Sequence, residues 1–142
     1  MRREELNFIL QKTDLSELRE LYKNIKKKHV VTILQSPTQQ TLLQPVYDPI
    51  SNGEFYGGEI LVTTTIVTVG NQSNKGWAMV LDDHEKLSLY IAVCDGAYAA
   101  GYFKDEIIKL VKDSKRKILL SQLEENKKVN STKVSFDLMA QG

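Results

Sequence analysis

The chain has 142 residues, a hydrophobic fraction of 42%, a charged fraction of 26% and a formal net charge of +1. These values are typical of one soluble globular domain with a single core. The nearly balanced charge argues against proteins that use a strong overall positive field to bind nucleic acid or anionic lipid.

Cysteine use and apolar patterning indicate a cytoplasmic protein. Cys94 is the only cysteine, so no disulfide can form within the chain. The first residues are charged and no long apolar region follows them, so no secretory signal is expected. The longest mostly apolar stretch, residues 87–103, contains Asp95 and is too short and interrupted to be expected to span a membrane.

Two N-terminal helices are predicted over residues 4–26. The first covers residues 4–11. The second begins after Asp14, which has the spacing of a helix N-cap with Glu17 three residues later. It ends in the lysines at 26–28, since cations suit a helix C-terminus.

Strands are predicted over residues 29–81. A β-branched run at 30–34 predicts a first strand, which Ser36-Pro37-Thr38 breaks, and residues 41–46 predict an edge strand that contains Pro45. Residues 47–53 are rich in turn formers and predict a loop. The clearest strand, residues 59–69, forms a hairpin with residues 76–81.

Helices return over residues 84–127. The first, to Gly101, is expected to be capped by Asp82 and Asp83, and the second covers residues 104–127. Alternation near the end predicts a short terminal strand at 132–137. The predicted fold is therefore a single α+β domain, with an antiparallel sheet and helices packed against it.

The strand at 59–69 is apolar on both of its faces. One face carries Ile60, Val62 and Ile66, and the other carries Leu61 and Val67. A sheet with one face in solvent alternates more cleanly, so both faces are expected to be covered. The helices of this chain cover one, and either a further helix or a partner protein covers the other.

The helix that starts near residue 84 is apolar around its whole circumference, which is typical of a buried helix. Asp95 lies within it and must be paired, because an isolated buried carboxylate is destabilising by several kcal/mol. Two interpretations stay open. Asp95 accepts a structural hydrogen bond from the backbone or a neighbouring lysine, or it forms an ion pair across a subunit interface.

No residue pattern indicates catalysis by this chain alone. His29, His84 and Cys94 are widely spaced, so no metal site is predicted, and Cys94 on an apolar helix is expected to be an inert small hydrophobe. Gly57-Gly58 leads into a strand and lacks the lysine and the helix of a phosphate-binding loop. No catalytic, cofactor-binding or metal-binding residue is predicted, and a binding or scaffolding role is favoured.

Three stretches, in order, resemble the G subunit of bacterial carbon–phosphorus lyase, the PhnG family. They are FYGGEILVT at 55–63, GWAMV at 76–80 followed by AVCDGA at 92–97, and VNSTKVSFDLM at 129–139. The two preceding helical segments and the total length also agree, so the resemblance covers nearly the whole chain.

Two positions depart from that family's pattern. Thr64 stands where the family usually carries an arginine, and Asp82-Asp83-His84 stands where it usually carries Gly-Arg-Asp. Both changes remove a cation that could contact a phosphate or a partner. The chain is therefore expected to contribute packing surface rather than substrate contacts.

The resemblance implies a non-catalytic subunit of α-D-ribose 1-methylphosphonate 5-triphosphate synthase. In that reaction a phosphonate attacks the ribose C1′ of ATP and adenine leaves, so ATP and the phosphonate are substrates of the assembled complex and not cofactors of this chain. The implied partners are the I, H and J subunits, and a homodimer of the isolated chain stays open. The predicted interface residues are Glu59, Thr63, Trp77, Asp95, Thr132, Lys133 and Phe136.

Two other functions stay open. A homo-oligomeric small-molecule binding or scaffolding protein would need a concave pocket near Trp77 or Tyr98. A weak stand-alone hydrolase would need a polar constellation that the sequence does not display.

Overall fold

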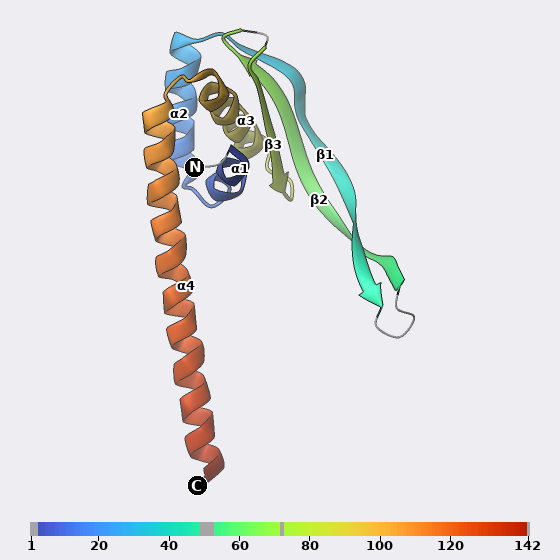
Figure 1. Ribbon diagram of the computed structural model, residues 1–142, viewed down its shortest axis with the longest axis vertical. Helices are drawn as coiled ribbons and strands as arrows, with labels where there is room; N and C mark the ends of the chain where they lie inside the picture. The colour runs from blue at the N-terminus through green and yellow to red at the C-terminus, as the bar shows by residue number, and fades with distance from the viewer. Residues whose placement is uncertain (1–2, 49–52, 72, 142) are drawn as a thin grey trace.

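The computed structural model describes residues 3–48, 53–71 and 73–141, with side chains over 3–42, 59–71 and 73–127. The described chain forms helices and an antiparallel sheet, which confirms the predicted α+β class (Figure 1). In order, the elements are α1 (Arg3–Leu10), α2 (Leu15–Lys28), β1 (Val31–Asp48), β2 (Gly53–Val69), β3 (Lys75–Leu81), α3 (Glu85–Ala100) and α4 (Lys104–Gln141).

The N-terminal helices form as predicted. The side chain of Asp14 caps α2 by accepting a hydrogen bond from the backbone N–H of Ser16 at 3.3 Å. Leu18, Leu21 and Ile25, spaced at three and four residues, place one face of α2 in the core.

The sheet has the order β1-β2-β3, and each strand pairs antiparallel with the next. The predicted hairpin between β2 and β3 is confirmed, with pairs that run from Val62–Leu81 to Thr68–Lys75. Because β3 is short, β2 and β1 extend beyond it as a two-stranded arm that projects from the body (Figure 1).

The predicted break at Ser36-Pro37-Thr38 is wrong, since β1 runs through it as one strand. The pairing with β2 shifts between Ile33 and Gln35 and again between Gln35 and Thr38, so β1 carries the extra residues as bulges. Proline is tolerated there because β1 is an edge strand. Of the predicted loop at 47–53, the two ends belong to β1 and β2, and residues 49–52 lie outside the described residues.

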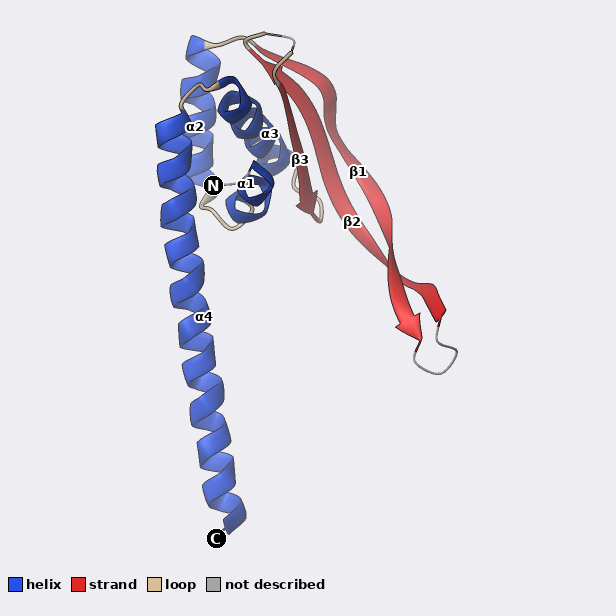
Figure 2. Ribbon diagram, viewed as in Figure 1, coloured by secondary structure: helices blue, strands red, loops and turns tan. Residues whose placement is uncertain are grey.

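The predicted buried helix is α3, and it lies against the inner face of the sheet (Figure 2). Every residue from Tyr90 to Ala97 is buried. Glycine permits this close packing, because a Cβ on Gly76 would lie 2.0 Å from the carbonyl oxygen of Ala92. Gly96 of α3 faces Gly76, and a Cβ on Gly96 would lie 3.2 Å from the Cα of Gly76.

Two predictions near the helices are wrong. Asp82 and Asp83 do not cap α3. Its N-cap is His84, which makes no side-chain capping bond. The terminal strand at 132–137 is also absent, because these residues continue α4 to Gln141. Once a helix is established, each further residue adds a hydrogen bond without a new nucleation step, and this outweighs a short alternating pattern.

The helices lie on one face of the sheet only (Figure 2). The expectation that the chain's own helices cover one face is confirmed. In the described part of the chain, no helix covers the other face, which we call the outer face.

Candidate functional site: a hydrogen-bonded sheet edge and an uncovered sheet face

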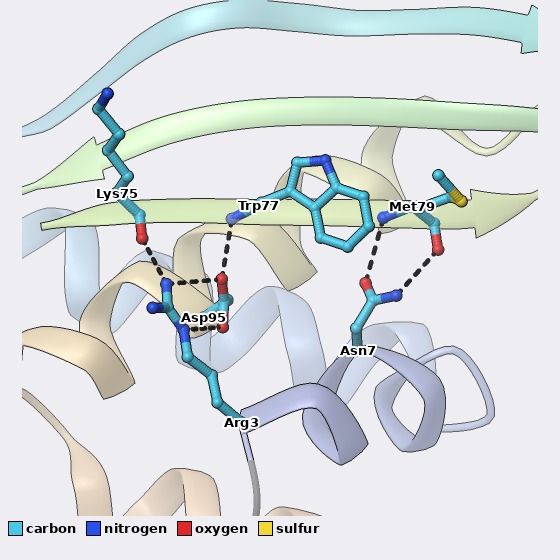
Figure 3. A network of polar contacts seen from close by, with 6 residues as sticks. All are labelled: Arg3, Asn7, Lys75, Trp77, Met79 and Asp95. Atoms are coloured by element: carbon cyan, nitrogen blue, oxygen red, sulfur yellow. Dashed lines mark hydrogen bonds and ion pairs between the residues drawn. The ribbon is translucent and has the colours of Figure 1, made fainter.

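A row of polar side chains on α1 and just after it hydrogen-bonds to the free edge of β3. Arg3 and Asn7 lie four residues apart in α1, and Gln11 lies four residues further on, just past Leu10, so the three point to the same side. Asn7 donates to the carbonyl oxygen of Met79 at 3.1 Å and accepts from its N–H at 3.2 Å (Figure 3). Gln11 accepts from the N–H of Leu81 at 3.2 Å. These side chains take the place of a fourth strand along β3.

Asp95 joins the same edge from α3. Arg3 Nε donates to Asp95 Oδ1 at 2.8 Å and Arg3 Nη2 donates to Oδ2 at 3.0 Å, while the N–H of Trp77 donates to Oδ2 at 2.9 Å (Figure 3). The hydrogen bond that Arg3 donates to the Asp95 carboxylate also raises the pKa of Arg3. The partners of Asp95 therefore come from this chain, and the cation is Arg3 rather than a lysine.

Thr63, another predicted interface residue, is fully buried beneath the start of α3. Its hydroxyl donates to the carbonyl oxygen of Asp82 at 2.6 Å and accepts from the N–H of His84 at 3.2 Å. Thr63 thus fixes the turn that leads into α3, and its contacts in this structure serve the fold.

Trp77 lies on the outer face of the sheet. In β3, Ala78 and Val80 are buried toward α3, so Trp77, Met79 and Leu81 point the other way. The exposed fraction is 45% for Trp77 and 60% for Leu81. The outer face therefore presents large apolar side chains around the predicted residue Trp77.

The other predicted interface residues lie on the two projecting elements. Glu59 is exposed on the β1–β2 arm, where it is the register partner of Leu43. Thr132, Lys133 and Phe136 belong to α4, and their side chains lie outside the described residues. The structure thus places Trp77 and Glu59 on the surface, and does not bring them together with Asp95 and Thr63 in one cluster.

A second apolar surface lies where α1 meets α4. Phe8, Ile9, Ile118 and Leu119 line a hollow of about 440 Å³, with the Lys115–Glu5 ion pair (3.2 Å) at its edge. Beyond it, every side chain from Leu119 to Lys127 is exposed, including Leu120 and Leu123. This part of α4 projects away from the body (Figure 1).

Cys94 is completely buried in α3. Burial raises the pKa of its thiol to about 12, with a smaller contribution from the neighbouring Asp95 carboxylate. The thiol therefore stays protonated at neutral pH, as expected for a structural cysteine.

The described residues hold neither a metal-ligand cluster nor a membrane-spanning helix. None of their His, Cys, Asp and Glu side chains gather in a group of three or more that could hold a metal ion. None of the described helices is both long enough and apolar enough to cross a membrane.

Arg3, Asn7 and Gln11 are not among the predicted site residues, although they organise the edge of the sheet. Their four-residue spacing, next to the apolar positions Leu6 and Leu10, is visible in the sequence. Such a stripe is also what a solvated helix face looks like, so only the position of β3 gives it a function.

Comparison with protein families identifies the chain. The family model for phosphonate metabolism protein PhnG matches residues 1–142, the whole chain. The chain therefore belongs to the PhnG family, which places it in phosphonate metabolism as a subunit of carbon–phosphorus lyase. A search of curated proteins found no match.

Proposed function

We propose that this chain is a non-catalytic subunit of the enzyme that makes α-D-ribose 1-methylphosphonate 5-triphosphate. Its role is to hold the catalytic subunit in its active form while a phosphonate attacks the ribose C1′ of ATP and adenine leaves. In this proposal ATP and the phosphonate bind to the assembled complex, in the cytoplasm, and this chain holds no cofactor or metal of its own. Its partners are the I, H and J subunits.

The observation that carries this proposal is the uncovered outer face of the sheet. A central strand that is apolar on both faces is typical of a sheet with both faces covered, yet the helices cover only one. Trp77 and Leu81 stand exposed on the other face. Exposed aromatic and aliphatic side chains of this kind are common at the centres of subunit interfaces.

The first experiment co-expresses the chain with the I subunit and measures two properties. One is co-elution in size-exclusion chromatography at micromolar concentration, and the other is adenine release from ATP in the presence of methylphosphonate. We expect a stable complex, with adenine release that requires both chains. If the I subunit releases adenine at the same rate without this chain, or if no complex forms, the proposal is wrong.

Substitutions on the outer face locate the contact. We expect Trp77→Ala and Leu81→Asp each to weaken the complex by about tenfold or more, because central apolar anchors carry most of the binding energy. Leu81 is the more exposed of the two, so for Leu81→Asp the free energy of unfolding of the isolated chain should change by less than about 1 kcal/mol, as measured by urea denaturation.

Leu15→Asp is the matched control, because Leu15 is 45% exposed, as Trp77 is, but lies at the start of α2. It should leave the complex intact. Equal loss of binding in the control and in the outer-face variants would mean that the outer face is not the interface.

The alternative is a homo-oligomeric small-molecule binding protein, and one hollow gives it a place to be tested. A cavity of about 310 Å³ lies beside Trp77, lined by Arg3, Glu4, Lys75 and Asp95. Its arginine is already paired with Asp95, which leaves Lys75 as the available cation. A shift in melting temperature with ATP or methylphosphonate, lost in Lys75→Met, would favour this alternative.

A further inference from the structure

In the part of the chain that the structure describes, the sheet has three stretches of free strand edge, and two of them are protected. The edge of β3 is occupied by α1 side chains and by Asp95. The edge of β1 carries Pro37, Pro45 and two bulges near Leu34 and Pro37, which are devices that hinder the addition of another strand. The third stretch is the side of β2 that extends past the end of β3.

This third stretch begins where β3 ends. Pairing between β2 and β3 stops at Val62–Leu81. The N–H of Asp82 then donates to the carbonyl oxygen of Leu61 at 2.8 Å, and Asp82, with φ 67°, turns the chain away. From Gly53 to Ile60, β2 has β1 on one side and no described strand on the other (Figure 1).

Main-chain groups in this stretch face the open side. The carbonyl of Leu61 points toward β3, since it accepts from Asp82. Along a strand the main-chain groups alternate with a period of two residues, so the N–H and C=O of Glu59 point to the same side, where β3 has ended. The register skips Gly57, which places a bulge there and leaves Gly58–Leu61 as the regular part of the edge, next to the end of β3.

A projecting two-stranded ribbon is a weak structure by itself. An isolated hairpin is marginally stable in water, and a third strand or a packed face is usually needed. The arm therefore gains stability from a strand added along β2, where the line of β3 continues.

Charge restricts the chemistry of that added strand. Residues 30–74 contain three carboxylates, Asp48, Glu54 and Glu59, and no lysine or arginine. The rest of the chain carries all 19 basic residues and 15 of the 18 acidic ones. The arm is thus acidic on a chain that is otherwise basic.

The same charges disfavour a second copy of this chain. Antiparallel pairing of residues 53–60 with themselves puts Glu54 of one copy opposite Glu59 of the other, twice. Like charges directly opposite each other in a sheet are destabilising. An extended segment that carries lysine or arginine would instead place cations against both carboxylates.

We propose that residues 53–61 of β2 receive an extended basic segment of a partner protein as a further strand of the sheet, collinear with β3. This inference deepens the proposed function, because another subunit of the complex is the expected partner. Main-chain hydrogen bonds supply the affinity and Glu54 and Glu59 select the basic segment.

The test uses the full chain co-expressed with the I subunit. In the complex, the Glu59 amide should exchange hydrogen more slowly than in the free chain, because a strand partner now accepts from it. Glu59→Pro removes that N–H, and Glu54→Lys with Glu59→Lys reverses the charges. Each change should weaken the complex about tenfold or more, whereas Glu20→Lys on the exposed surface of α2, the control, should not.

Suppose that the complex forms, that the arm variants bind the I subunit as tightly as Glu20→Lys does, and that the Glu59 amide exchanges as fast in the complex as in the free chain. The strand-addition proposal is then wrong, while the proposed function stands. If the I subunit does not bind at all, the proposed function fails, and a peptide decides this inference separately. A nine-residue peptide that alternates lysine with valine or threonine should then slow exchange at Glu59, and the same peptide with glutamate for lysine should not. No slowing with the lysine peptide would overturn the inference.

Discussion

At the scale of single residues, small side chains and paired polar groups determine how closely the layers pack. Gly76 and Gly96 let β3 and α3 approach until their backbones touch. Thr65 and Ser88 share a buried hydrogen bond of 2.7 Å between the same layers. Among the described residues, no buried side-chain nitrogen or oxygen lacks a partner.

Gly76→Ala should be severely destabilising. Its Cβ would lie 2.0 Å from the Ala92 carbonyl oxygen, which is backbone and cannot move aside. We expect the free energy of unfolding to fall by more than about 3 kcal/mol in urea denaturation.

Gly101→Ala is the matched control for that substitution. A Cβ there meets nothing within 4 Å, although the φ of +84° is unfavourable for alanine. The loss should be about 1–2 kcal/mol. A loss in Gly76→Ala no larger than in Gly101→Ala would contradict the close contact between β3 and α3.

At the scale of elements, α3 decides the architecture because it is buried on nearly all sides. It contacts the sheet through Gly96 and Ser88, and it carries Asp95 to the edge of β3. The burial of α3 can be tested through Cys94, because its buried thiol resists ionisation and this makes the free energy of unfolding depend on pH.

Cys94 should make the protein less stable in alkali. Its pKa is about 12 when folded, against 9.0 for an exposed thiol. Between these values the unfolded chain binds fewer protons than the folded chain, so stability is fully present below about pH 9 and falls as the pH rises toward 12. The slope from this group is about 1.4 kcal/mol per pH unit.

Cys94→Ala removes that contribution. Urea denaturation at several values between pH 8 and pH 11 should give a shallower decline in the variant than in the parent chain. Tyrosine and lysine ionisation affects both proteins alike, so the difference between the two curves isolates the thiol. Parallel curves would show that Cys94 is accessible when the protein is folded.

At the scale of the whole molecule, the chain is a small body with two projections, the β1–β2 arm and the C-terminal part of α4 (Figure 1). A helix of 38 residues is about 57 Å long, well beyond the body that anchors its first turns. Such a shape exposes more surface than a small domain requires. It suits a member of a multi-subunit complex, as the PhnG family suggests.

Hydrogen exchange should reveal this division directly. Amides of α3 and β3 are expected to exchange only through global unfolding, because buried residues surround them. Amides of β2 from Gly53 to Ile60 should exchange at least about a hundredfold faster, because opening the arm does not disturb the core. Equal protection in the arm and in α3 would contradict the described division between body and arm.

The sequence by itself determined the local elements and the family. The helical spacing of Leu18, Leu21 and Ile25, the cap at Asp14 and the all-round apolar character of α3 all depend on neighbours in sequence, so they could be predicted. The family resemblance rests on motifs spread over nearly the whole chain and is confirmed by the match to residues 1–142.

Only the tertiary structure decided which side chains work together. Arg3 and Asp95 are 92 positions apart, and Thr63 accepts from His84, which precedes a helix that begins about twenty residues after Thr63. The continuity of β1 through Pro37 depended on its place at the edge, and helix propagation overrode the terminal alternation at 132–137. Pairings of this kind depend on where strands and helices meet in space, which local propensity does not encode. For the same reason, the uncovered face around Trp77 and the open edge at Glu59 could be located only once the fold was known.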